Sequence, residues 1–220
     1  MKRLFLAFFA ILLSASIGFG QTDQGTMYLG GSFMVSSAAI KYKSKSTTVD
    51  GPKTFSFGID PKVGFFMADN LMIGAGVGFN MATTKQEGVD PGDPDETKLT
   101  VSEFHIMPLA RYYIKPLDHS AFFIQAGIPV AFGTEKDEVT DGGTTVSEEA
   151  KITAFGVHIN PGLVYWATEA VCLEVTVGEL SYMSETAKTG SGDDEMKTIH
   201  SGFDLNFNPG FFTFGVGFHF

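Results

Sequence analysis

Apolar and polar residues alternate along most of the chain after residue 26, in long segments with a period of two. This period is typical of β-strands that have one apolar face and one polar or small face. In one such segment Ile73, Ala75 and Val77 alternate with Gly74 and Gly76. The pattern predicts eight strands, at residues 26–37, 53–67, 71–82, 99–113, 120–133, 151–166, 171–183 and 199–220.

The connections between these strands alternate in length as regularly as the strands themselves. The short connections are 67–70, 114–119 and 167–170. The long, polar connections are about fifteen residues each and lie near 38–52, 83–98, 134–150 and 184–198. Short turns on one side and long loops on the other are typical of outer-membrane barrels. We therefore expect an all-β fold, an eight-stranded antiparallel up-and-down transmembrane β-barrel with short periplasmic turns, long extracellular loops and both termini on the periplasmic side.

Three of the predicted strands carry a proline four residues before an aromatic pair, just ahead of a short turn. The pairs are Phe65-Phe66, Tyr112-Tyr113 and Tyr165-Trp166. Because amphipathic rings favour the headgroup zone, we expect the pairs to form an aromatic girdle at the periplasmic interface. Proline cannot donate to the strand ladder, so we also expect bulges or local irregularity at these positions.

The last strand changes its apolar face part of the way along. Phe203, Leu205 and Phe207 are apolar at odd positions, whereas the end of the chain is apolar at even positions. A bulge around 208–210 would shift the phase by one residue. A turn at the same place, making a ninth strand, would put Phe220 on the outer side and spoil closure. The even-numbered apolar residues of the closing segment are Phe212, Phe214, Val216, Phe218 and Phe220.

These features resemble a known family. Residues 60–79 look like two strands joined by a tight periplasmic turn, and Arg111-Tyr112-Tyr113 and the closing strand match as well. The chain is similar to the small OmpA/OmpX-like barrels of Gram-negative outer membranes, in particular the Bacteroidetes-type outer membrane protein beta-barrel domain. The resemblance implies that the closing strand is the signal read by the barrel-assembly machinery. It implies no reaction, because the matching motifs are architectural.

The beginning of the chain predicts export. Lys2 and Arg3 precede an apolar run too short to span a bilayer as a helix, and small residues follow it. We expect a signal peptide at 1–20 and an outer-membrane barrel domain at 21–220. Loss of the two positive charges takes the formal charge from −10 to about −12, so nucleic acid is not an expected partner. Cys172, the single cysteine, cannot form an internal disulfide, and no zinc motif is present, so we expect no metal and no cofactor.

Many polar residues fall on the predicted inner face of the strands. The interior of an eight-stranded barrel is only wide enough to be filled by side chains, so these groups must bond to one another or to water. Since Lys62, Arg111 and Glu174 all lie close to short turns, we expect a salt-bridge cluster that plugs the periplasmic half. The alternative is a gated narrow pore in which Glu174 exchanges partners between Lys62 and Arg111. The inward polar residues are Asp60, Lys62, Glu103, His105, Arg111, Gln125, His158, Asn160 and Glu174.

The long connections differ in charge. The first is basic, with Lys41, Lys43, Lys45 and Lys53, and the other three are rich in Asp and Glu. Solvated loops are the simpler interpretation. A sharper alternative is a site for Ca²⁺ or Mg²⁺, because oxygen-rich clusters suit these ions. The basic loop would contact lipopolysaccharide phosphates directly. The candidate cation ligands are Asp90, Asp93 and Asp95, although Pro91 and Pro94 interrupt them.

The expected function is that of an outer-membrane barrel with a structural or loop-mediated binding or adhesion role. Its expected partners are outer-membrane lipid, lipopolysaccharide, the assembly machinery and an extracellular ligand. A narrow porin-like channel is the first alternative and a lipid A-modifying enzyme the second. We do not expect an enzyme, because His200 and Ser201 are adjacent in a strand and point to opposite faces, and no Ser accompanies His105 and Glu103. The alternative fold is a soluble lipocalin-like barrel.

Overall fold

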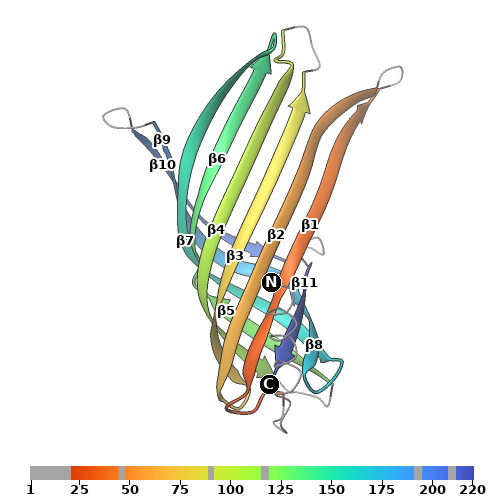
Figure 1. The fold of residues 1–220 in the computed structure, drawn as a ribbon, viewed down its shortest axis with the longest axis vertical. Helices are drawn as coiled ribbons and strands as arrows, with labels where there is room; N and C mark the ends of the chain where they lie inside the picture. The colour runs from red at the N-terminus through yellow and green to blue at the C-terminus, as the bar shows by residue number, and fades with distance from the viewer. Residues whose placement is uncertain (1–20, 45–47, 89–91, 115–118, 191–194, 208–211) are drawn as a thin grey trace, which may run out of the picture.

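The computed structural model describes residues 21–44, 48–88, 92–114, 119–190, 195–207 and 212–220, so the expected signal peptide lies outside the described residues. These ranges contain β-strands, and no helix among them is long and apolar enough to cross a membrane (Figure 1). The strands are β1 (Met27–Lys43), β2 (Thr48–Ala68), β3 (Leu71–Glu87), β4 (Glu96–Ile114), β5 (Ser120–Gly127), β6 (Val130–Asp141), β7 (Thr144–Trp166), β8 (Val171–Val177), β9 (Glu179–Thr189), β10 (Met196–Asn206) and β11 (Phe212–His219).

The strands form an antiparallel ring with eight wall positions, which confirms the predicted fold class. Three positions are each shared by two consecutive strands: β5 with β6, β8 with β9, and β10 with β11. At the first, Pro129 interrupts the ladder, but the register on β4 and β7 continues unchanged from β5 to β6. At the second, Gly178 is an extra residue with a φ of 73°, so it forms a bulge.

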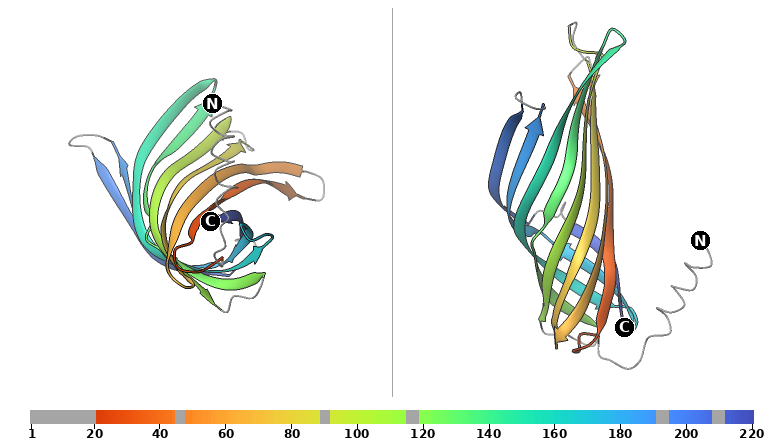
Figure 2. Two further views of the ribbon diagram at one scale, coloured as in Figure 1. Left: turned by 60° about the horizontal axis from the view of Figure 1, so that its bottom comes forward. Right: turned by 60° about the vertical axis from the view of Figure 1, so that its left-hand side comes forward.

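The ring closes where the two ends of the chain meet. Strand β1 pairs with β11 from Tyr28 opposite His219 to Ser32 opposite Gly215. The Met27 amide donates to the Phe220 carbonyl at 2.7 Å, and the Phe220 amide donates to the Met27 carbonyl at 3.0 Å. Both ends of the described chain therefore lie at the end of the barrel with the short turns, as predicted (Figure 2).

The outer face of the ring carries a continuous apolar band. In β4, for example, Phe104, Ile106 and Tyr112 point outward and are exposed, while the intervening Met107 and Arg111 are buried inside. Such a band, facing lipid, is the expected exterior of a membrane barrel. The band ends, on the side far from the termini, with one outward apolar residue on each wall position. These residues are Val35, Phe55, Phe79, Phe104, Phe132, Phe155, Tyr182 and Phe203.

Strands occupy most of the residues of the four long connections, so these connections are largely β-hairpins that extend beyond the apolar band. The ladder continues past the apolar band to Lys43 in β1, Glu87 in β3 and Asp141 in β6, where Gly142 and Gly143 turn the chain into β7. We call these parts the strand extensions. Their alternation is between polar residue types, so the hydrophobic pattern does not reveal them. They comprise residues 36–43, 48–54, 80–87, 96–103, 133–141, 144–154, 183–189 and 196–202.

The prediction for the aromatic pairs is half right. Phe65, Tyr112 and Tyr165 are about half exposed on the outer face, as a girdle requires. The second residue of each pair points inward and is almost completely buried, because neighbouring residues in a strand face opposite sides. These second residues are Phe66, Tyr113 and Trp166.

The change of face in the last wall position is confirmed by the register on its two sides. Asn206 of β10 lies opposite Glu179, whereas Thr213 of β11 lies opposite Thr176. The inward positions therefore change from even to odd numbers between the two strands. The segment 208–211, in which we expected the bulge, lies outside the described residues.

Candidate functional site in the barrel interior

The lower half of the interior, near the termini, is filled around one arginine. Arg111 of β4 is fully buried, and its Nη1 donates to Glu174 Oε1 of β8 at 2.6 Å. Its Nη2 and Nε donate to Gln125 Oε1 of β5 at 2.9 and 3.3 Å. A buried ion pair is tolerated when such additional hydrogen bonds satisfy its remaining groups.

Aromatic rings enclose this ion pair. The Arg111 guanidinium lies 4.2 Å from the ring centre of Phe123 and 5.2 Å from that of Tyr28, within the range of cation–π attraction. Below them, Trp166 and His219 pack edge to face with ring centres 5.9 Å apart. We call these groups, together with Phe66, Met72 and Tyr113, the periplasmic plug. Arg111, Tyr28, Phe66, Met72, Tyr113, Phe123 and Trp166 are all at most 2% exposed, so the plug closes the lower lumen.

Cys172 of β8 also belongs to the plug. Its thiol is fully buried, donates to Glu174 Oε1 at 3.8 Å and lies 3.6 Å from Nε2 of His219. His219 in turn contacts the Gln21 carbonyl through Nδ1. The thiol is therefore shielded on all sides by packed side chains, which is the environment of a structural cysteine.

The expected trio of Lys62, Arg111 and Glu174 separates in the structure. Arg111 and Glu174 form the buried pair, whereas the Lys62 ammonium is 3.9 Å from Asp60 and belongs to the next layer up. The sequence placed all three near short turns, but the distance that a side chain spans across the lumen depends on the tilt of the strands.

That upper layer contains the other predicted polar residues. His105 Nε2 lies 3.3 Å from Asp60 Oδ1, and its Nδ1 lies 3.8 Å from Glu103 Oε1. His158 Nδ1 lies 3.8 Å from Glu179 Oε2, which also accepts a hydrogen bond from Asn160 Nδ2 at 3.1 Å. These side chains line a cavity of about 360 Å³. The structure thus brings the predicted residues together in two layers, a dry plug and a polar cavity above it.

Sequence reasoning missed a row of polar residues on three neighbouring strands. His158, Ser181 and Asp204 lie opposite one another in the register of β7, β9 and β10, all facing inward. A histidine, a serine and an aspartate are also the three residue types of a serine hydrolase site. However, His158 Nε2 points toward Gly127 of β5, on the far side from Ser181, and has no hydrogen-bond partner. The histidine therefore does not activate the Ser181 hydroxyl, as such a site requires.

The other predicted chemical sites are placed as follows. Ser201 Oγ lies 3.0 Å from Ser184 Oγ, while His200 lies opposite Glu185 on the inner face, so the two neighbours point apart as expected. Asp95 Oδ2 accepts a hydrogen bond from the Gly142 amide at 3.0 Å, and Asp90 lies outside the described residues. Among the described residues no group of three metal-binding side chains occurs, and the cation site stays a prediction.

The outer face of the strand extensions carries a lysine on each wall position. These lysines alternate with carboxylates; Glu138, for instance, accepts hydrogen bonds from Lys98 at 2.7 Å and from Lys136 at 2.8 Å. The two ammonium groups lower the pKa of the Glu138 carboxyl to about 2. We call this set the outer lysine belt. It consists of Lys41, Lys53, Lys85, Lys98, Lys136, Lys151, Lys188 and Lys197.

Comparisons with known proteins agree with this architecture. The family described as "Outer membrane protein beta-barrel domain" matches residues 19–220. The chain is similar in fold to the outer membrane protein OprG of Pseudomonas aeruginosa, with 16% identity, a TM-score of 0.52, and coverage of 92% of this chain and 99% of that one. Neisserial surface protein A is 18% identical with a TM-score of 0.38, covering 90% of this chain and all of that one. No curated protein matches the chain.

Proposed function

The chain belongs to the outer membrane protein beta-barrel domain family, and we propose that it is a scaffold, without catalytic or conducting activity, whose strand extensions bind partners outside the cell. Its location in the outer membrane follows from that family. The observation that carries the proposal is the length of the strands. They continue well beyond the apolar band as paired β-structure, so a rigid surface projects from the membrane.

The periplasmic plug supports the absence of conduction. A path for ions would have to pass Arg111 and Glu174, whose charged groups are 2.6 Å apart and packed between aromatic rings. Opening such a path would leave a buried charge without its partner, which is strongly unfavourable. The interior also supports the absence of catalysis, since His158 Nε2 is directed away from Ser181.

The outer lysine belt supports lipopolysaccharide as one partner. It lies just beyond the apolar band, at the height where the phosphates and sugars of outer-leaflet lipid begin. Lysine ammonium groups bind phosphate as point charges. Lys151 forms no ion pair among the described residues, so its ammonium is available to such an anion.

A shortened hairpin tests the binding surface. Lys136 and Glu149 are cross-strand partners, so replacing residues 137–148 with Asn-Gly joins them through a two-residue turn. The deletion removes four carboxylates and leaves every lysine of the belt in place, so we expect the purified variant to keep heat-modifiable gel migration and to bind a lipopolysaccharide-coated sensor more tightly than the wild type. The wild type should show no steady conductance in planar bilayers.

Lys151→Gln is the matched point variant, and we expect it to weaken the same binding while the barrel stays folded. Unaltered lipopolysaccharide binding by both variants would contradict the proposed binding surface. Steady ion conductance by the wild type would instead support the narrow channel.

A further inference from the structure

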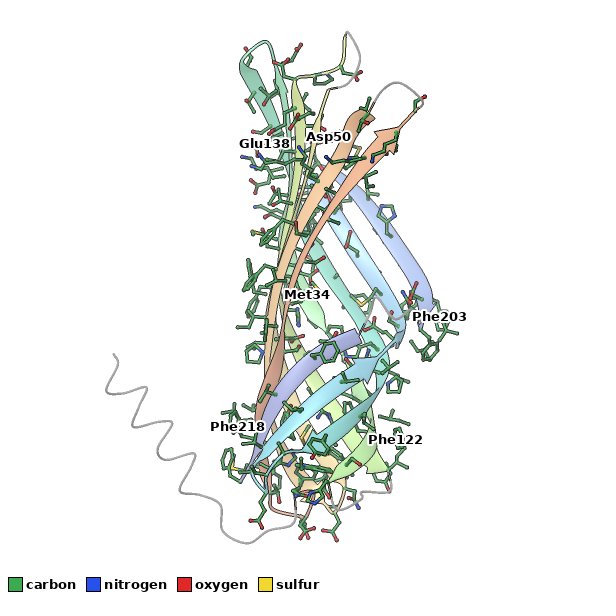
Figure 3. The ribbon with its side chains drawn as sticks, turned by 90° about the vertical axis from the view of Figure 1, so that its right-hand side faces the viewer. Met34, Asp50, Phe122, Glu138, Phe203 and Phe218 are labelled. Atoms are coloured by element: carbon green, nitrogen blue, oxygen red, sulfur yellow. The ribbon has the colours of Figure 1, made fainter. Side chains whose placement is uncertain are left out.

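The strand extensions separate their charges by face. Every lysine of the extensions points outward, because Lys43 shares the phase of Lys41 and the others form the outer lysine belt. Figure 3 shows Asp50 and Glu138, two carboxylates that pair with these lysines, on the extensions above Met34. The inner face has no lysine or arginine among the described residues of the extensions. Its carboxylates are Glu103, Glu135, Asp137, Asp141, Glu148 and Glu185.

The inner carboxylates of β6 and β7 have no cation to pair with. Glu135 and Asp137 continue the inward series of the buried Ala131, and Asp137 lies directly opposite Glu148 in the register. Like charges at directly opposite positions of a sheet repel one another. None of these three carboxylates forms an ion pair among the described residues. A cationic group from another molecule would therefore relieve the repulsion.

Apolar side chains accompany these carboxylates, although this surface lies beyond the apolar band. Leu99 lies opposite Asp137 on the β4 side and is 38% exposed. Val146, two residues before Glu148 on β7, is 69% exposed. Exposed apolar side chains that gather outside the membrane are typical of a binding surface. We call this surface the inner acidic face, and it consists of Leu99, Val101, Glu135, Asp137, Val139, Val146 and Glu148.

The inner acidic face is preformed and concave. Strand β4 pairs with β6 from Glu96 to Ile106, and β6 pairs with β7 from Val130 to Asp141. The paired strands curve together, with this face on the inside of the curve (Figure 2). A surface that is already ordered loses little conformational freedom when it binds a partner. Because eight wall positions enclose a narrow interior, a single extended chain fits this face better than a folded domain.

We propose that the inner acidic face binds a cationic peptide segment that presents lysine or arginine together with apolar side chains on one side. The inference rests on the proposed binding role of the strand extensions and gives their inner face a partner other than lipopolysaccharide. The cationic groups pair with Asp137 and Glu148, and the apolar side chains pack on Leu99 and Val146. The unpaired carboxylates select the sign of the partner and repel phosphate, which binds to the outer lysine belt instead.

The proposal is tested by calorimetry on the full mature barrel in nanodiscs of zwitterionic lipid. The probe is a peptide of three Lys-Ser-Leu-Ser repeats, which places lysine and leucine on one face of an extended chain. One comparison peptide has glutamate in place of lysine, and the other has serine in place of leucine. Relative to empty nanodiscs, we expect saturable binding of the probe and no binding of the glutamate peptide. The peptide without leucine should bind at least about five-fold more weakly, because it buries less apolar surface.

Variants on the two faces of one strand locate the binding. Asp137→Asn and Glu148→Gln should each weaken probe binding about three-fold, as expected for an exposed ion pair, and about ten-fold together. Glu149→Gln is the matched control, because it makes the same change of charge at the next residue. Glu149 lies opposite Lys136 on the outer face, so this variant should bind the probe like the wild type. Heat-modifiable migration of each variant shows that the barrel is folded.

Two results would overturn the proposal. Equal weakening by Glu148→Gln and Glu149→Gln would mean that the probe responds only to the net charge of the barrel. Saturable binding of Ca²⁺ without binding of the probe would assign the carboxylates to a divalent cation. Lys151→Gln should weaken lipopolysaccharide binding and leave probe binding unaltered, so the proposed function and this inference can fail separately.

Discussion

At the residue scale, the interior depends on one buried ion pair. Arg111 is almost completely buried, so water does not solvate its guanidinium. The charge is stabilised instead by Glu174, by Gln125 and by the enclosing aromatic rings. The neighbouring Lys62–Asp60 pair is wetter and longer, at 3.9 Å. The two layers therefore respond differently to substitution, because only the first leaves an uncompensated charge in a dry site.

Glu174→Gln should destabilise the barrel by about 3–5 kcal/mol, since Arg111 keeps its charge without a partner. Unfolding by urea in detergent micelles can be followed through Trp166, the only tryptophan of the chain and part of the plug. The double variant Arg111→Met with Glu174→Leu should recover most of the loss, because it removes both charges. A single variant as stable as the wild type would show that the ion pair is dispensable.

Glu174→Ala in planar bilayers separates the plug from a gate. If Glu174 exchanges partners to open a pore, its removal should change the conductance of the reconstituted barrel. We expect the trace to remain as silent as that of the wild type, because Tyr28, Phe66 and Trp166 still fill the lumen. A new, stable conductance level would favour the gated pore.

Outside the membrane, Glu138 should titrate far below an ordinary glutamate. Its pKa is lowered from 4.5 to about 2 because Lys136 and Lys98 donate hydrogen bonds to the ionised carboxyl. The stability that these ion pairs contribute is therefore present above pH 4.5 and is lost as the pH falls through about 2. Carboxyl carbon shifts in NMR measure the titration. Replacing both lysines by Gln should return the pKa toward 4.5, and an unshifted titration in the wild type would contradict the pairing.

At the element scale, irregular positions within the wall decide which residues of each strand face inward. Gly178 changes the inward phase of its wall position between β8 and β9, and the last wall position changes phase at the same height. The two changes compensate, so inward residues stay inward on both sides of the irregularity. The break at Pro129 leaves the phase unchanged, because β5 and β6 keep one register.

Gly178→Val should destabilise the barrel by at least about 1–2 kcal/mol. Gly178 has a φ of 73°, which costs this much for a residue with a Cβ, and the added group would meet the Asn206 carbonyl. The control is Gly202→Ala in β10, where a Cβ would meet nothing within 4 Å, with an expected change within about 0.5 kcal/mol. Urea midpoints of the two variants, compared with the wild type, decide the matter; equal midpoints would mean that the bulge tolerates a side chain.

At the scale of the whole molecule, the barrel is closed at the end where the two ends of the described chain meet. That end contains the plug and the pairing of β1 with β11, whereas β10 pairs only with β9 among the described residues (Figure 2). The strand extensions continue the wall beyond the membrane, so binding at their outer face does not involve the plug.

Hydrogen exchange should distinguish strands that are paired on both edges from strands that are paired on one. Strand β3 is paired on both edges over nearly its whole length, whereas among the described residues β1 above Ser32 and β10 are each paired on one edge. In nanodiscs at neutral pH we expect the amides of 34–43 and 196–206 to exchange faster than those of 72–86, because half of them lack a ladder partner. Uniform protection around the ring would show instead that β1 and β10 join in the membrane.

The sequence alone determined the eight wall positions, the short turns, the outward and inward sets of residues and the change of face in the last wall position. These features are local, because a period of two and a turn are visible within a few residues. It also indicated which polar residues enter the lumen. It could not indicate that Arg111 would meet Glu174, 63 positions away, while Lys62 would not.

The tertiary structure alone decided the contacts across the lumen and the extent of the wall. Which side chains meet depends on the tilt and stagger of strands that are distant in sequence, and Tyr113 and Trp166 turned inward to fill space that only the closed ring defines. The sequence pattern did not predict the strand extensions, because these are stabilised by pairs of polar residues on neighbouring strands. Such pairs are distant in sequence, so they leave no hydrophobic period.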